Sequence, residues 1–327
     1  MNAVEAMKAR RLVRYAYEIY DLKPWEHKDK LGIILIQLNN RKTPYYVVFL
    51  EESIVVLPNV AALIGLFLNA QYEHMPSIQR LRYQQHLLCT FVHPSEVDDV
   101  MMELFTSSEA SVREDVLPMF ESTMPSLLPD VLVKKEIDVL VDVYVQALSA
   151  IKEILEEDQT INFDEQMHTW NFSFDENRWV LSSDELPSSN LDVEPLVLDS
   201  HSTEIINNAQ QLDDEWEVDI AYTSIMLEPQ ENHRQHAIRL GMIAHHEAPY
   251  IYAQGLIKED NHPHLQLLES FVNVIKERGK PKKIFVRDQI MLEVMTSLCE
   301  SVNIEIQESE VLNTIDIFVE ELSESMM

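Results

Sequence analysis

The last third of the chain, residues 216–327, has an order of predicted elements that few folds can accommodate. Apolar runs of strand length predict three consecutive strands, and residues with helical spacing then alternate with further short apolar runs. The predicted elements are strands at 216–226, 236–245 and 250–257, a helix at 263–278, a strand at 283–286, a helix at 289–302, a strand at 304–306 and a helix at 312–323. Strands that alternate with helices imply a parallel pair covered by helices, so residues 201–327 are predicted to form an α/β domain.

Residues 1–186 predict a separate domain of the α+β class, in which strands and helices are less regularly mixed. Its predicted elements are helices at 4–20, 59–72, from Pro94 onward and at 134–157, strands at 31–38, 45–50, 53–57 and 86–92, and a hairpin at 169–181. Between these domains, residues 187–200 replace periodic hydrophobic positions with Pro, Ser and Asp, which predicts an acidic linker.

Three prolines interrupt the pattern ahead of the long helix at 134–157. Pro118, Pro125 and Pro129 each lack a backbone N–H and restrict the residue before them. The stretch Met119-Phe120-Glu121 between them is therefore predicted to be an irregular, extended connection.

The charge of the chain limits its partners. The formal net charge is −31, and residues 156–215 contain 16 acids against one base, Arg178. Such a surface repels a nucleic-acid backbone, so nucleic acid is not expected as a partner. Two interpretations stay open: the acids keep the protein soluble, or they engage a basic protein surface or imitate nucleic acid.

The residue composition also excludes several kinds of site. The chain has 5 glycines and no glycine-rich phosphate-binding motif, and no catalytic nucleophile motif is present. Its two cysteines, Cys89 and Cys299, predict neither a disulfide framework nor a cysteine-based zinc site. A cytoplasmic location is expected, because no signal peptide is visible and Pro58 interrupts the longest apolar stretch, residues 54–70.

Short motifs in both halves carry a resemblance that spans most of the chain. They are Pro24-Trp25-Glu26, the stretch 118–122 ahead of two further prolines, Trp216-Glu217-Val218-Asp219 and Val286-Arg287-Asp288. With these motifs the chain resembles a family of bacterial two-domain proteins of unknown function, which implies two domains and no particular activity.

A second resemblance concerns residues 216–327 alone. This part of the chain resembles integrases and transposases of the ribonuclease-H-like superfamily. The resemblance lies in Trp216 and Asp219 on the first strand, in the three strands in succession, and in Asp288 after the fourth strand. The resemblance implies that Asp219 and Asp288 are metal ligands and that the last helix supplies a third catalytic carboxylate, Glu320 or Glu321. Such enzymes use magnesium or manganese ions to clamp the attacking and leaving oxygens of a phosphodiester.

Each of these acids also has an ordinary structural explanation. Asp219 fits the polar face of an alternating strand, and Asp288 fits the N-cap of the helix that follows it. Asp288 is followed by Gln289 and Ile290, where integrases commonly have Asn-Gly. Glu320 and Glu321 fit the exposed face of a terminal helix.

Basic residues and histidines cluster in the same third of the chain. Lys280, Lys282, Lys283 and Arg287 form a basic run that approaches Asp288, which predicts a phosphate or partner contact, although cations at a helix C-terminus explain part of the run equally well. Half of the 12 histidines lie in residues 233–264, but their spacing matches no zinc motif, and surface histidines are the simpler interpretation.

Three functions remain open from the sequence. The leading hypothesis is an acidic, non-catalytic interaction or regulatory protein that binds a protein partner with a basic surface and needs no cofactor. The first alternative is a metal-dependent ribonuclease-H-like nuclease or nucleotidyl-transfer enzyme that uses Asp219, Asp288 and Glu320. The second is an inhibitor that imitates nucleic acid. Whether the protein is an enzyme is therefore left undecided.

Overall fold

A computed structural model of the chain shows two compact units. The structure describes residues 2–39, 41–97, 99–125, 127–161, 166–185, 195–226, 234–257 and 262–326, without the side chains of 99–101 and 226. Unit 1 comprises Met1–Phe67, Tyr83–Met124 and Pro129–Ser188, and unit 2 comprises Leu68–Arg82, Pro125–Leu128 and Ser189–Met327. Unit 2 therefore takes two short stretches from the part of the sequence that predicted one continuous domain at 1–186.

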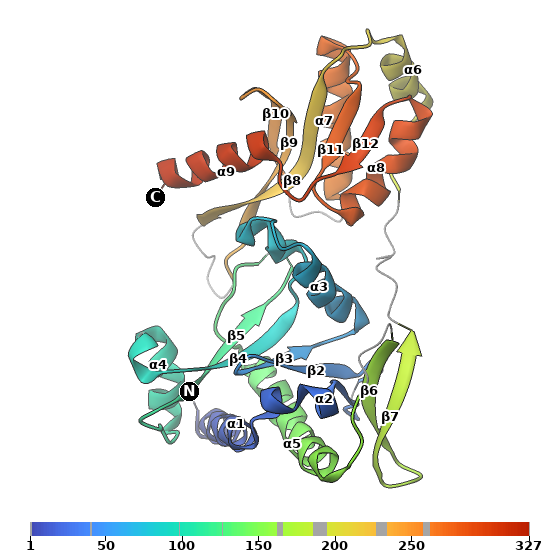
Figure 1. Cartoon of the computed structure of the whole chain (residues 1–327). Helices are drawn as coiled ribbons and strands as arrows, with labels where there is room; N and C mark the ends of the chain where they lie inside the picture. Colours follow the sequence, from blue (N-terminus) through green and yellow to red (C-terminus); the bar gives the residue numbers. More distant parts are fainter. Residues whose placement is uncertain are drawn as a thin grey trace. The chain divides into compact units, whose positions relative to one another are not determined.

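Unit 1 is built on a seven-stranded sheet with the order β5-β4-β3-β2-β1-β6-β7 (Figure 1). Neighbouring strands are antiparallel except β1 and β6, which run parallel. The strands are β1 (Ile33–Ile36), β2 (Tyr45–Leu50), β3 (Ser53–Leu57), β4 (His86–Val92), β5 (Leu117–Thr123), β6 (Gln166–Ser173) and β7 (Arg178–Glu185).

Helices cover both faces of this sheet. Helices α1 and α5 share one core with residues such as Val47 and Phe120, whereas α3 packs over Val55 and Leu57 on the opposite face. Asn2 stabilises the start of α1, because its side chain accepts hydrogen bonds from the Val4 and Glu5 N–H groups. The helical elements are α1 (Ala3–Leu22), η1 (Pro24–His27), α2 (Lys28–Leu31), α3 (Val60–Gln71), η3 (Pro94–Glu96), α4 (Asp99–Ser108) and α5 (Lys134–Glu156).

The connection predicted around Met119 is instead a regular strand. β5 pairs with β4 along its whole length, and it forms the edge of the sheet. On its other side, Ser122 exchanges backbone hydrogen bonds with Asp130, which shows that the polar groups of Ser122 point away from β4. Pro118 has the same orientation because it lies four residues earlier. Its missing N–H would have pointed to the open edge, so the proline costs the sheet no hydrogen bond.

Unit 2 has a five-stranded sheet with the order β10-β9-β8-β11-β12. The first three strands in the sequence are antiparallel, whereas β11 lies parallel to both β8 and β12. The elements are η2 (Ser77–Arg82), α6 (Ser200–Asn208), β8 (Glu215–Met226), β9 (Ala237–His245), β10 (Ile251–Leu256), α7 (Pro263–Arg278), β11 (Lys283–Val286), α8 (Gln289–Ser301), β12 (Glu305–Glu308) and α9 (Asn313–Met326).

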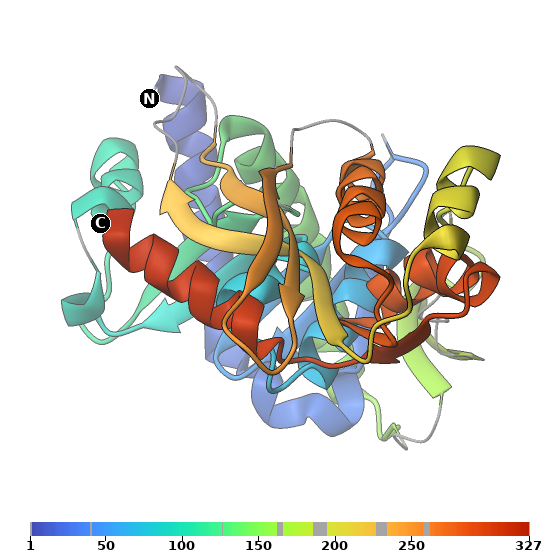
Figure 2. The same ribbon diagram turned by 90° about the horizontal axis from the view of Figure 1, so that it is seen from above.

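Two separate cores lie on the two faces of this sheet. Helices α7 and α8 bury Trp216, Val218 and Ile243, and α9 packs on the other face over Ala221 and Phe285. Figure 2 shows α7 and α9 on opposite sides of the strands. Each unit thus combines a mixed sheet with helices, which confirms the predicted mixture of α and β structure in both parts of the chain.

Two further features concern the sequence predictions. The helix expected from Pro94 onward begins later, because residues 94–96 form a 3₁₀ turn and α4 starts at Asp99. The predicted linker 187–200 lies largely outside the described residues. Within the described residues, no helix is long and apolar enough to cross a membrane.

Candidate functional site

Asp219 and Asp288 lie close together in unit 2, where the parallel pairing of β8 with β11 ends. β8 and β11 are parallel, and Val218 pairs with Val286, so Asp219 follows one residue after this pair and Asp288 two residues after it. Both side chains are buried, with 0% and 1% of their surface exposed. Asp288 is also the N-cap of α8, since its Oδ1 accepts a hydrogen bond from the Met291 N–H at 2.8 Å.

Arg82 joins the two carboxylates. Its Nη1 atom lies 3.1 Å from Asp219 Oδ1 and 2.8 Å from Asp288 Oδ2, and its Nη2 atom lies 3.3 Å from Asp219 Oδ2. The Arg82 side chain is itself only 9% exposed. One guanidinium group therefore occupies the space between the two acids that the sequence predicted as metal ligands.

A second arginine completes the cluster from the other side. Arg287 is fully buried, and its Nε donates to Asp219 Oδ2 at 2.6 Å. Its two terminal nitrogens bind the carboxylate of Asp316 in the first turn of α9, at 2.7 and 3.2 Å. Arg82, Arg287, Asp219, Asp288 and Asp316 are named here the arginine–carboxylate cluster.

The 3₁₀ helix η2 is fixed on β8 by a glutamine. Gln79 is buried, and its side-chain amide donates to the Tyr222 carbonyl at 2.8 Å while its carbonyl accepts from the Tyr222 N–H at 2.9 Å. The same Gln79 oxygen accepts from Arg82 Nη2 at 3.1 Å. Because Gln79 satisfies both backbone groups of Tyr222, it sets the position from which Arg82 reaches the two acids.

The two arginines of the cluster favour the ionised form of Asp219. Burial raises the pKa of Asp219, but the nearby Arg82 and Arg287 guanidinium groups outweigh this effect and hold the pKa below its usual value. Burial likewise lowers the pKa of Arg287, and the charges of Asp219 and Asp316 reverse this effect. With three acids and two arginines, the cluster is nearly neutral, which is the condition under which charges can be buried.

The cluster does not fit the two-metal centre that the resemblance implied. A divalent ion needs free carboxylate oxygens, whereas both oxygens of Asp219 and both of Asp288 already accept hydrogen bonds. Two guanidinium groups would also repel the ion at close range. Among the described residues, no group of three or more His, Cys, Asp or Glu side chains is arranged to hold a metal ion.

The acid that α9 contributes is not the one that the sequence indicated. Glu320 and Glu321 are exposed, and neither takes part in the hydrogen bonds of the cluster. Asp316, one helical turn before Glu320, binds Arg287 instead and also accepts from the Leu312 N–H at 3.0 Å. Of these three acids of α9, the structure places Asp316 in the cluster and leaves Glu320 and Glu321 outside it.

The predicted basic run is dispersed by the fold. Arg287 is inside the cluster, and Lys280 is buried with its Nζ donating to the Val302 carbonyl at 2.8 Å. Lys282 lies 3.5 Å from Asp213, and Lys283 lies 3.2 Å from Glu305. Two of the four residues thus serve internal contacts, and a partner contact stays a prediction only for Lys282 and Lys283.

One histidine takes part in a buried polar contact near the cluster. His246 stacks on Phe285 with ring centroids 3.9 Å apart, and its Nδ1 lies 3.1 Å from Glu217 Oε1. The other Glu217 oxygen accepts from the Ile315 N–H at 3.0 Å, which ties β8 to the start of α9. His246 therefore has a structural role, in packing on Phe285 and contacting Glu217. Of the other histidines, His233 lies outside the described residues.

Sequence reasoning missed Arg82, Gln79 and Asp316. Arg82 lies 137 positions before Asp219 in a stretch without a recognisable motif. Asp316 had a weak signal, since an Asp in the first turn of a helix is favoured by the helix dipole. Nothing in the spacing linked either residue to Asp219 or Asp288.

Comparison with known proteins gives families but no activity. Residues 10–171 match a family model described as "Domain of unknown function (DUF7309)", and residues 203–323 match "Domain of unknown function (DUF6930)". These matches confirm the expectation of two domains from families of unknown function. None of the curated proteins matches the chain. Among solved structures, the chain is similar to the catalytic core domain of HTLV-2 integrase in complex with magnesium, with 15% identity over 36% of this chain and 75% of that chain and a TM-score of 0.26.

Proposed function

We propose that a chain built from these two domains of unknown function acts as a non-catalytic interaction protein, and that unit 2 uses a ribonuclease-H-like fold as its scaffold. The observation that carries this proposal is the position of Arg82, whose Nη1 atom hydrogen-bonds both Asp219 and Asp288. The support for the fold is the succession of β8, β9, β10, α7, β11, α8, β12 and α9.

The arginine contacts make the enzyme alternative the weaker one. Metal-dependent phosphodiester cleavage requires carboxylates that exchange their ligands with the metal ion and its water molecules. In this protein Asp219 would first have to lose Arg82 and Arg287, both of which are buried beside it. Breaking a buried ion pair leaves an uncompensated charge and costs about 3–5 kcal/mol. The cluster is therefore a structural element of unit 2 in this proposal.

The surface charge indicates the chemistry of the partner. The chain has 56 acidic residues against 25 Lys and Arg. A protein with this field attracts basic protein surfaces and speeds their association, and it repels nucleic acid. Mimicry of nucleic acid rested on residues 156–215, which lie partly outside the described residues, and it is not proposed.

The experiment that tests this proposal combines metal binding with nuclease activity. Thermal unfolding of the parent and of Asp219→Asn is measured with and without millimolar Mg²⁺ or Mn²⁺, beside cleavage of single-stranded and duplex DNA and RNA. We expect no metal-dependent rise in the parent's midpoint and no cleavage above that of the variant. A midpoint that rises with metal in the parent alone, together with cleavage that Asp219→Asn abolishes, would overturn the proposal.

A further inference from the structure

β5 ends the sheet of unit 1 with backbone groups that point outward. Within the described residues, β4 is the only strand that pairs with β5. Ser122 shows which groups face outward, because its N–H and C=O bond to Asp130 on the side away from β4, at 2.8 and 3.1 Å. Backbone orientation repeats every second residue of a strand, so the N–H and C=O of Phe120 face the same open edge.

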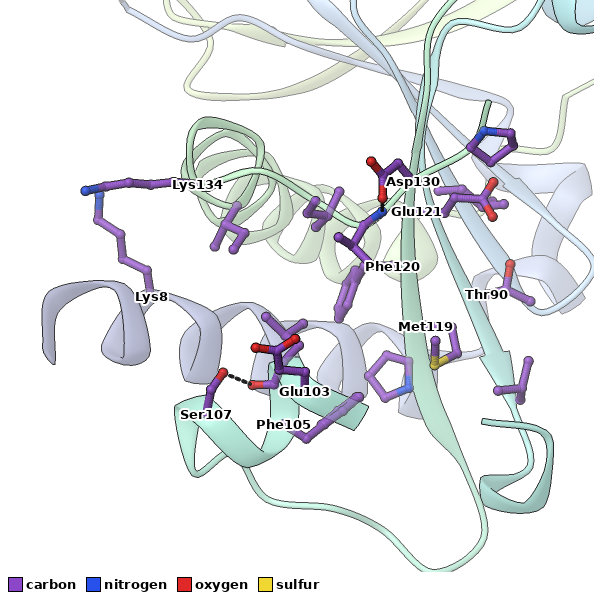
Figure 3. Close-up of a pocket in the computed structure, with 18 of the residues that line it drawn as sticks. Lys8, Thr90, Glu103, Phe105, Ser107, Met119, Phe120, Glu121, Asp130 and Lys134 are labelled. Atoms are coloured by element: carbon purple, nitrogen blue, oxygen red, sulfur yellow. Dashed lines mark hydrogen bonds between the residues drawn. The ribbon is translucent and has the colours of Figure 1, made fainter. Parts of the chain in front are cut away.

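A cavity of about 730 Å³ lies beside this edge. Its apolar lining includes Leu88, Phe105, Met119 and Leu132, contributed by β4, α4, β5 and the segment before α5. We name this cavity the β5 groove. Figure 3 shows that its walls extend to both faces of β5, with Glu103 and Phe105 on one side of the strand and Thr90 and Glu121 on the other. The volume and the mainly apolar lining are typical of binding sites.

The charged residues of the β5 groove are mostly acids. Both lysines in its wall are paired, since Lys8 lies 2.7 Å from Asp138 and Lys134 lies 2.8 Å from Glu5. The four remaining acids of the groove form no ion pair with a Lys, Arg or His in the part of the chain that the structure describes. These acids are Glu96, Glu103, Glu121 and Asp130.

Glu121 is the acid most affected by its surroundings. Its side chain is half-buried on β5, and burial raises its pKa, while a hydrogen bond from Thr123 Oγ1 at 3.3 Å opposes this effect. A cation placed beside Glu121 would stabilise the ionised carboxylate. The β5 groove therefore offers a carboxylate whose charge gains from a basic ligand.

We propose that the β5 groove binds an extended, basic segment of a protein partner whose lysine or arginine side chains project to both sides of the segment, and that this segment hydrogen-bonds the outward-facing backbone groups of Phe120. The proposal rests on the proposed function and names the place on unit 1 where the basic partner binds. Successive side chains of an extended segment point to opposite sides, so two adjacent basic residues reach both faces of β5. Carboxylates stand on both faces of β5, at Glu103 and Glu121, while Phe120 supplies backbone groups at the edge.

The test uses a fluorescently labelled peptide of sequence Val-Lys-Lys-Val-Lys-Lys-Val, in which adjacent lysines point to opposite sides, and it measures binding by fluorescence anisotropy at low salt. Two control peptides accompany it: one in which glutamate replaces lysine, and one with N-methyl groups on alternate backbone amides. The groove variant is Glu103→Gln with Glu121→Gln, and its matched control is Glu320→Gln with Glu324→Gln on the exposed face of α9. Circular dichroism checks that every variant is folded.

We expect the lysine peptide to bind the parent, and the groove variant to weaken this binding at least tenfold while the α9 variant changes it less than twofold. N-methylation is expected to weaken binding, and peptide binding is expected to slow hydrogen exchange of the Phe120 amide. An equal loss of affinity in both variants, or an affinity that N-methylation does not change, would indicate that the peptide binds the general acidic surface. Either result would overturn the proposal. Absence of binding would also overturn it. Neither outcome affects the metal and cleavage experiment, which alone decides whether the protein is catalytic.

Discussion

Arg82 and Asp219 are separated by 137 positions in the sequence, yet the Nη1 atom of Arg82 lies 3.1 Å from Oδ1 of Asp219. The contact joins the end of a 3₁₀ helix to the middle of the central strand β8. It also reaches Asp288 after β11 at 2.8 Å. This guanidinium therefore links the two carboxylates that follow the parallel pairing of β8 with β11.

Replacing Arg82 is expected to destabilise unit 2 strongly. Arg82→Gln leaves Asp219 and Asp288 buried without this cation, which costs about 3–5 kcal/mol. Hydrogen exchange of the β8 and β11 amides measures the loss in unit 2 directly. The control is Arg14→Gln, because Arg14 is 61% exposed and its contacts, an ion pair with Glu18 and a cation–π contact with Tyr15, lie on the same helix. A change of less than about 0.5 kcal/mol is expected there, and an equal effect of both variants would contradict the prediction.

The stability of the protein is expected to depend on the charge of Asp219 in acid. Burial raises the pKa of Asp219, but Arg82 and Arg287 hold it below the ordinary value of 3.8. The stabilisation by the carboxylate is thus complete above about pH 3.8 and is lost as the pH falls through the lower pKa of the folded state.

The pH dependence is tested by comparison with Asp219→Asn. We expect the difference in unfolding free energy between the parent and this variant to be constant above pH 5 and to shrink below pH 3.8. Asp175→Asn, in the exposed turn between β6 and β7, serves as the control. A difference that stays constant down to pH 2 would show that the two arginines do not lower the pKa of Asp219 in the folded protein.

Asp316 is expected to matter more than Glu320. Asp316→Asn weakens two hydrogen bonds from Arg287 and one from the Leu312 N–H, so a loss of about 1–3 kcal/mol is expected. Glu320→Gln changes an exposed side chain and is expected to alter the unfolding free energy by less than about 0.5 kcal/mol. Chemical denaturation of the two variants measures both values. The reverse ranking would show that the contacts of Asp316 do not stabilise unit 2.

The two cysteines are expected to be unreactive in the folded protein. Burial raises the pKa of Cys299 to about 12, and burial also raises the pKa of Cys89 far above its usual value. Both side chains are fully buried, so neither a thiolate nor access is available. Ellman's reagent at pH 8 should detect no thiol in the native protein and two after denaturation. Rapid reaction of one thiol in the native state would show local opening of its core.

The two ends of helix α7 could be predicted from the sequence because their signals are local. Helix α7 begins at Pro263, and Gly279 follows its last residue at a positive φ of 118°. Such residues mark the ends of helices without reference to the rest of the fold. The neighbouring positions of Asp219 and Asp288 also follow once β8 and β11 are placed side by side.

Local signals failed where a residue's role depends on its distant neighbours. Pro118 indicated an irregular connection, but its position at an open edge makes a strand possible, and the sequence does not show which strand lies at an edge. The role of Arg82 could not be predicted for the same reason, because its partners come from β8 and from the residue after β11. Exposure separates Asp316 from Glu320 on α9, and it depends on how the helix packs.

The stretch 68–82 has a consequence for any work on the isolated C-terminal half. A fragment that begins after residue 189 contains Asp219, Asp288 and Arg287 but lacks Arg82 and Gln79, which unit 2 takes from the first half of the sequence. In that fragment the carboxylates of Asp219 and Asp288 lose their shared cation and become open to solvent cations. Metal binding or weak cleavage by such a fragment would therefore result from the truncation, which removes the protein's own internal counter-ion.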